Sequence, residues 1–77
     1  MHELGITAEI VEIAARYATS ERVRRVVVEI GRETAVLPDA VRFCFDFCAE
    51  GTSVQGAELE IVQLAGDELR VRTVEVG

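Results

Sequence analysis

The chain has 77 residues, 49% of them hydrophobic, and its 14 acidic residues outnumber its 8 basic ones to give a formal charge of −6. This length allows one domain around a single small core, and an acidic chain whose arginines gather in no patch makes nucleic acid an unsuitable partner. No apolar run approaches the roughly 18 residues of a membrane span and no secretory signal opens the chain, so we expect a soluble, cytoplasmic protein.

The first expected element is an amphipathic helix from Leu4 to about Thr19, because apolar residues recur there at helical spacing. The residues assigned to its buried face are Ile6, Ile10, Ile13, Ala14 and Tyr17. The β-branched stretch from Arg22 to Gly31 then predicts a strand. Its core side is expected to carry Val26, Val28 and Ile30. Glu29 falls on the opposite side, toward solvent.

Pro38 and Asp39 suit the first turn of a second helix, which should run to about Glu50 and stop at Gly51. Its expected buried face consists of Val41, Cys44, Phe45 and Cys48, widened by Phe43 and Phe47. The two cysteines lie four residues apart on one helix face, so a metal or redox role is conceivable. Burial as small apolar side chains is the more ordinary role, and no disulfide framework follows from them.

Two further strands are expected, from Glu58 to Leu64 and from Glu68 to Val76, with a break at Gly66-Asp67. So short a turn predicts that they pair as an antiparallel hairpin. The fold class is therefore α+β, in the order helix-strand-helix-strand-strand, with two helices packed on one face of a three-stranded mixed sheet. Residues 1–77 should form a single domain.

Catalytic motifs are missing from the sequence. It has one histidine and no phosphate-binding glycine loop, and Glu58 and Glu60 share a solvent-facing side of a strand, where nothing prepares them for acid catalysis. We therefore expect no enzyme. An enzyme acting through Cys44 or Cys48 would need an accessible, acidic thiol.

The first three residues form the candidate metal site. The amine of Met1, the backbone nitrogen of His2 and the imidazole of His2 can close adjacent chelate rings around one ion, with three nitrogens nearly in a plane. Such nitrogen sets favour Ni(II) or Cu(II), and Glu3 could add an oxygen ligand or a hydrogen bond. A histidine at position 2 is, on its own, more often a plain terminal residue.

The opening Met1-His2-Glu3-Leu4-Gly5-Ile6 resembles that of the HypA/HybF family of hydrogenase-maturation nickel chaperones. Segments that resemble the family's first strand, second helix and next strand follow in the same order: Val26 to Gly31, Pro38 to Phe45 and Gly56 to Ile61. The resemblance implies a nickel carrier that supplies Ni(II) for NiFe-hydrogenase maturation. It also implies a partner GTPase, the hydrogenase large subunit as recipient, and a nickel site made by Met1, His2 and Glu3.

One feature of the family is missing from the sequence. Members ordinarily carry a zinc-binding lobe with two Cys-x-x-Cys pairs before the final strand, whereas residues 64–67 here lead directly toward that strand. Cys44 and Cys48 are too few and wrongly spaced to replace it, so we expect no zinc. The alternative function is a zinc-less remnant that acts as an interaction module, binding partners or itself as a homodimer, without effective nickel delivery.

Overall fold

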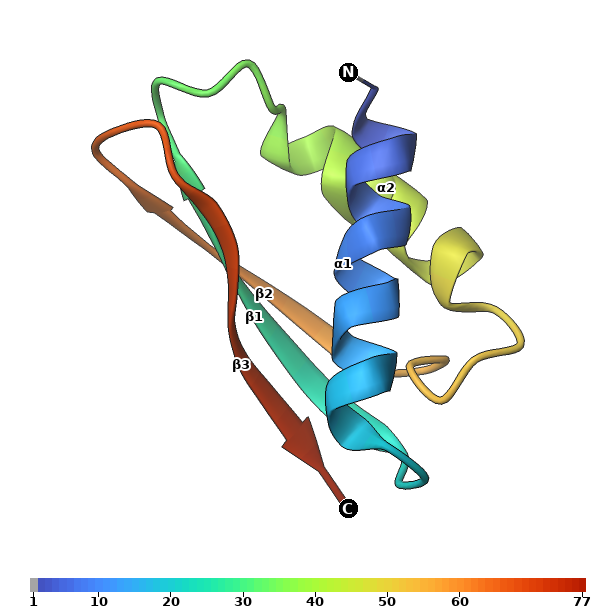
Figure 1. Cartoon of the computed structure of the whole chain (residues 1–77). Helices are drawn as coiled ribbons and strands as arrows, with labels where there is room; N and C mark the ends of the chain where they lie inside the picture. Colours follow the sequence, from blue (N-terminus) through green and yellow to red (C-terminus); the bar gives the residue numbers. More distant parts are fainter. Residues whose placement is uncertain (1) are drawn as a thin grey trace.

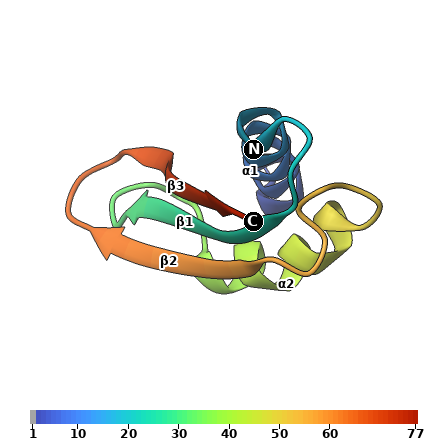
Figure 2. The same ribbon diagram turned by 90° about the horizontal axis from the view of Figure 1, so that it is seen from below.

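The computed structural model describes residues 2–77, which form two helices and one three-stranded sheet (Figure 1). The elements follow as α1 (Glu3–Ala18), β1 (Val23–Gly31), α2 (Pro38–Ala49), β2 (Glu58–Leu64) and β3 (Leu69–Val76). Both helices lie on one face of the sheet, α1 toward β3 and α2 toward β2 (Figure 2). The predicted α+β class and element order are confirmed. No helix in residues 2–77 is long and apolar enough to cross a membrane.

The sheet has the order β2-β1-β3, with β1 in the centre. β1 runs parallel to β2, with Val28 opposite Ile61, and antiparallel to β3, with Val28 opposite Val71. The predicted hairpin between the last two strands is therefore wrong, because β2 and β3 lie on opposite sides of β1. The glycine-containing turn does reverse the chain, but it carries the chain over the end of β1 and not back along β2.

Residues 65–68 cross the C-terminal end of β1 and are held there by backbone hydrogen bonds. The N–H of Gly31 donates to the carbonyl of Glu68 at 2.7 Å, and the N–H of Glu33 donates to the carbonyl of Gly66 at 2.8 Å. A Cβ at position 31 would overlap the carbonyl of Gly66. Glycine ends β1 because no side chain fits beneath the crossing chain.

The core lies between the sheet and the two helices. The central strand contributes its predicted core side, and Val26, Val28 and Ile30 are all fully buried. The helices and the loop before β2 complete the cluster with Ile6, Ile10, Val11, Ala14, Val41, Phe45, Ala49 and Val54. Removal of these side chains from water is the main force that holds the two layers together.

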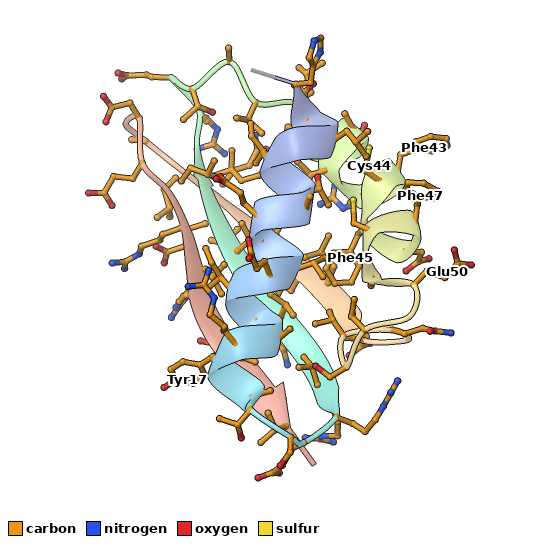
Figure 3. The ribbon with its side chains drawn as sticks, turned by 45° about the vertical axis from the view of Figure 1, so that its right-hand side comes forward. Tyr17, Phe43, Cys44, Phe45, Phe47 and Glu50 are labelled. Atoms are coloured by element: carbon orange, nitrogen blue, oxygen red, sulfur yellow. The ribbon has the colours of Figure 1, made fainter. Side chains whose placement is uncertain are left out.

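The outer margins of both predicted helix faces lie in solvent. Four large side chains expected in the core are exposed: Ile13 by 45% and Tyr17 by 76% on α1, and Phe43 by 88% and Phe47 by 71% on α2 (Figure 3). Cys44 and Cys48 are only partly buried. The predicted stripes were too wide, because a narrow three-stranded sheet and one neighbouring helix cover only a narrow band of each helix.

Glu29 is buried, although the alternation of β1 predicted it in solvent. Its side chain is 9% exposed, and its Oε1 accepts a hydrogen bond from Nε of Arg70 at 2.6 Å, while Nε of Arg72 lies 3.7 Å from Oε2. The bond raises the pKa of Arg70. A carboxylate tolerates burial when it is paired in this way. Glu29 thus faces away from the helices, as predicted, but beneath the long side chains of β3.

Candidate metal centre

The start of α1 fixes the geometry of His2. This residue is the N-cap of the helix, with extended backbone angles of φ −88° and ψ 147°, and its carbonyl accepts the N–H of Ile6 at 3.1 Å. Its side chain is exposed and does not cap the helix. The N–H of an N-cap residue also stands ahead of the helical hydrogen-bond ladder. The carbonyl of His2 is therefore hydrogen-bonded within the helix, whereas its amide nitrogen and imidazole remain available to other partners.

Glu3, the first residue of α1, connects that helix to the start of α2. Its Oε2 accepts a hydrogen bond at 3.1 Å from the backbone N–H of Leu37, the N-cap residue of α2. This bond lowers the pKa of Glu3, because a donor favours the charged carboxylate. The buried Thr7 donates from Oγ1 to the carbonyl of Glu3 at 2.6 Å. Glu3 is thus fixed at both its side chain and its backbone.

A shallow, mostly apolar hollow lies beside these residues, between the starts of the two helices. Its walls are His2, Glu3, Leu4 and Gly5 from α1, with Ala40 and Cys44 from α2. Within residues 2–77, no group of three or more His, Cys, Asp or Glu side chains is gathered closely enough to hold a metal ion.

Two of the three predicted ligands, His2 and Glu3, are consecutive residues at the start of α1, as its N-cap and its first helical residue. The third, Met1, lies outside the described residues. Sequence reasoning missed Leu37 and Cys44, which complete the surroundings from α2. No local pattern joins them to the first residues, since 34 positions separate Glu3 from Leu37.

Cys48 lies further along α2, with its Sγ 3.9 Å from the carbonyl oxygen of Leu4. Burial raises the pKa of this thiol, and the neighbouring Cys44 adds to the effect. A thiol with a raised pKa stays protonated at neutral pH, where it is a poor nucleophile and a poor metal ligand. These surroundings argue against a thiol-dependent enzyme that would act through Cys48.

The comparison with known protein families decides where the chain belongs. Residues 1–69 match the family model described as HypA, hydrogenase/urease nickel incorporation, metallochaperone. The chain belongs to the HypA family. The resemblance read from its first residues and from three later segments is thereby confirmed.

Curated HypA relatives match over most of this chain. The hydrogenase maturation factor HypA of Nostoc sp. (strain PCC 7120) is 54% identical over 66 residues, which are 86% of this chain and 58% of the relative. That of Geobacter sulfurreducens is 46% identical over 66 residues, again 86% of this chain, and 60% of the relative. The chain therefore spans about three fifths of the length of these HypA proteins.

A solved HypA structure shares the fold. It is the solution structure of the Ni metallochaperone HypA from Helicobacter pylori, which superposes with a TM-score of 0.84 at 18% sequence identity. The superposition covers 99% of this chain and 97% of that one. The arrangement of helices and strands described above is thus the HypA arrangement.

Proposed function

We propose that this HypA-family domain carries Ni(II) for the maturation of NiFe-hydrogenase, as a carrier and not as an enzyme. Membership of a metallochaperone family is the observation that carries the proposal. The curated relatives bear the name hydrogenase maturation factor. The GTPase of the maturation machinery and the hydrogenase large subunit are the partners to which such a carrier would pass its ion.

The ion is proposed to bind at the start of α1, to the amine of Met1 and to the amide and imidazole nitrogens of His2. The position of His2 supports this site, because its side chain is exposed and its amide precedes the helical ladder. Three nitrogens in one plane suit the square-planar preference of Ni(II). Glu3 supports the site from the first turn, where its charge lies next to the cation and its bond to Leu37 holds the turn in place.

The same surroundings suit release as well as binding. The hollow beside His2 is open to solvent, and its wall from α2 contributes apolar and thiol groups but no carboxylate. An ion held mainly by nitrogens of the first two residues can be reached by the ligands of an acceptor protein. An enclosed cage of side chains would not permit such a transfer.

A calorimetric nickel titration tests the site. The protein that starts at Met1 should bind Ni(II), and a Gly-Ser extension placed before Met1 should weaken binding at least tenfold, because it removes the terminal amine. His2→Ala should weaken binding to a similar degree. Glu9→Gln is the matched control, since Glu9 is an exposed carboxylate on the same helix beyond its first turn. Equal affinity in the extended protein would rule out the amine as a ligand.

A further inference from the structure

An apolar groove follows the line along which α1 and α2 meet at the surface. It is lined by Leu4, Ala8, Val11, Glu12 and Ala15 of α1, and by Phe47, Cys48 and Thr52 from α2 and the turn after it. The α1 side of the groove spans three helical turns, or about 16 Å. Leu4 belongs both to this groove and to the hollow beside His2, so the two surfaces are continuous.

Large exposed apolar side chains lie in and next to the groove: Phe47 is part of its lining, and Phe43 lies outside the lining on the same side of α2. Phe43 and Phe47 are one helical turn apart on α2 and project away from the sheet (Figure 3). Leu4 at the end of the groove is 49% exposed. Single exposed apolar residues are ordinary, but two phenylalanines beside an apolar groove mark an interaction surface.

The helical layer around the groove carries most of the negative charge of the molecule. Residues 3–18 and 38–50 hold six carboxylates and two guanidinium groups, a formal −4 of the total −6. Both guanidinium groups pair within their own helix, Arg16 with Glu12 and Arg42 with Asp39. The remaining carboxylates without a cationic partner among residues 2–77 include Glu9, Asp46 and Glu50. The potential over this layer therefore favours a cationic partner.

We propose that the groove is the docking site of a positively charged amphipathic helix from a partner protein. Its apolar side chains would lie against Leu4, Ala8 and Phe47, and its lysines or arginines would face the acidic residues of α1 and α2. Three turns fill the length of the groove. A second copy of this chain fits poorly, because it would bring the same negative layer against itself. The surface involves no metal ion, so it stands or fails independently of the proposed nickel site.

A synthetic helix serves as the probe in metal-free buffer. A labelled peptide of about 14 residues, with leucines at positions i, i+3, i+4 and i+7 and lysines elsewhere, is titrated with the full chain and followed by fluorescence anisotropy. It should bind, and binding should weaken as salt is raised, because the charges are exposed. A peptide with glutamates in place of the lysines, and a lysine peptide with scrambled leucines, should each bind at least tenfold more weakly.

Two protein variants locate the surface. The double variant Phe43→Ser/Phe47→Ser should weaken peptide binding at least tenfold. The matched control is Tyr17→Ser, since Tyr17 is equally an exposed aromatic residue but lies beside β3, on the other side of α1. It should change the affinity less than twofold. All of these side chains are largely exposed, so thermal unfolding should stay close to that of the unmodified protein.

Three results would overturn the proposal. Equal binding of the glutamate peptide would show that the negative charge of the helices does not attract the peptide. An equal loss of affinity in both protein variants would show that the peptide does not bind at this groove. A dimer of the unmodified protein in sedimentation velocity, abolished by the phenylalanine double variant, would assign the surface to a second copy. Backbone amide shifts in the unmodified protein give a measurement that needs no variant, because the lysine peptide should perturb Leu4 to Ala15 and leave β3 unchanged.

Discussion

At the scale of single residues, Glu3 connects the start of α1, where the nickel site is proposed, to the start of α2. The N–H of Leu37 donates to its carboxylate and lowers its pKa. A carboxylate with a lowered pKa in the folded state adds stability at pH values above its ordinary pKa. That stability is lost as the pH falls through the lowered value.

Substitution of Glu3 should therefore lower the stability of the domain at neutral pH but not in acid. Glu3→Gln is expected to lower the urea midpoint at pH 7, and the difference from the unmodified protein should shrink once the pH falls below the ordinary value of 4.5. Urea unfolding followed by circular dichroism at several pH values measures this. Glu9→Gln should leave the midpoint unchanged. A difference that persisted undiminished to about pH 3 would show that the charge of Glu3 does not matter.

Nickel affinity should fall on acidification. An imidazole and an α-amine must both lose a proton before they coordinate a metal, so protons compete with Ni(II) for the nitrogens of Met1 and His2. Affinity measured by calorimetry, corrected for buffer ionisation, should decrease steadily from about pH 8 to about pH 5.5. An affinity that did not change across this range would contradict the ligands proposed here.

The ion pairs of Glu29 and Glu12 should differ in their effect on stability. Glu29 is held beneath Arg70 and Arg72 with a side chain 9% exposed, whereas Glu12 and Arg16 are 4.0 Å apart and largely in water. Glu29→Gln should lower the melting temperature by at least about 4 °C, because it weakens a charged hydrogen bond to a carboxylate that is itself buried. Glu12→Gln should lower it by less than about 2 °C. Equal shifts in a thermal melt would show that burial of Glu29 has no effect on its pairing.

At the scale of elements, local patterns predicted which segments form helices and strands, but not how those segments meet. Helical spacing and β-branched runs lie within short windows, so α1, α2 and the three strands could be read directly. The partners of β1 could not, because its pairing with β3 joins residues 39 to 53 positions apart. The exposure of Phe43 depends in the same way on how little of α2 the narrow sheet covers. The site shows the same limit, since the sequence indicated His2 and Glu3 but not their neighbours from α2.

The crossing of residues 65–68 over β1 makes a prediction for Gly31. Gly31→Ala should destabilise the domain by about 2 kcal/mol or more, because the added methyl group would overlap the backbone of Gly66. Urea unfolding gives the difference in free energy. Gly5→Ala is the matched control, since its methyl group would meet nothing within 4 Å, and in the first turn of α1 alanine should leave the stability unchanged or slightly raised. Similar losses in both variants would contradict this account of the crossing.

At the scale of the whole molecule, residues 2–77 are as compact as a domain with a hydrophobic core of its own. The radius of gyration is 11.5 Å, about the value expected of a compact domain of this length. The apolar side chains between the sheet and the helices account for this compactness. The proposed nickel site lies at one end of α1, outside the core. At that position the proposed nickel ion would be a cargo and would not support the fold.

Removal of metal should leave the fold unchanged. A large excess of EDTA is expected to shift the melting temperature by less than about 2 °C, because neither His2 nor Glu3 of the proposed site belongs to the core. Thermal melts by circular dichroism with and without chelator measure this, and the same chelator should abolish nickel binding in the titration. A drop of more than about 5 °C would show that a metal ion helps to close the domain.

The central position of β1 also bears on how the domain forms during synthesis. β1 leaves the ribosome before either of its neighbours, and the strand that covers one of its edges, β3 (residues 69–76), is made after both β1 and β2. A nascent chain that reaches only Leu64 has the parallel pair β1 and β2 and an uncovered edge of β1 beside α1. Parallel, non-local pairing of this kind forms slowly. The domain should therefore complete its fold only after β3 has emerged, and until then the edge of β1 is open to other chains.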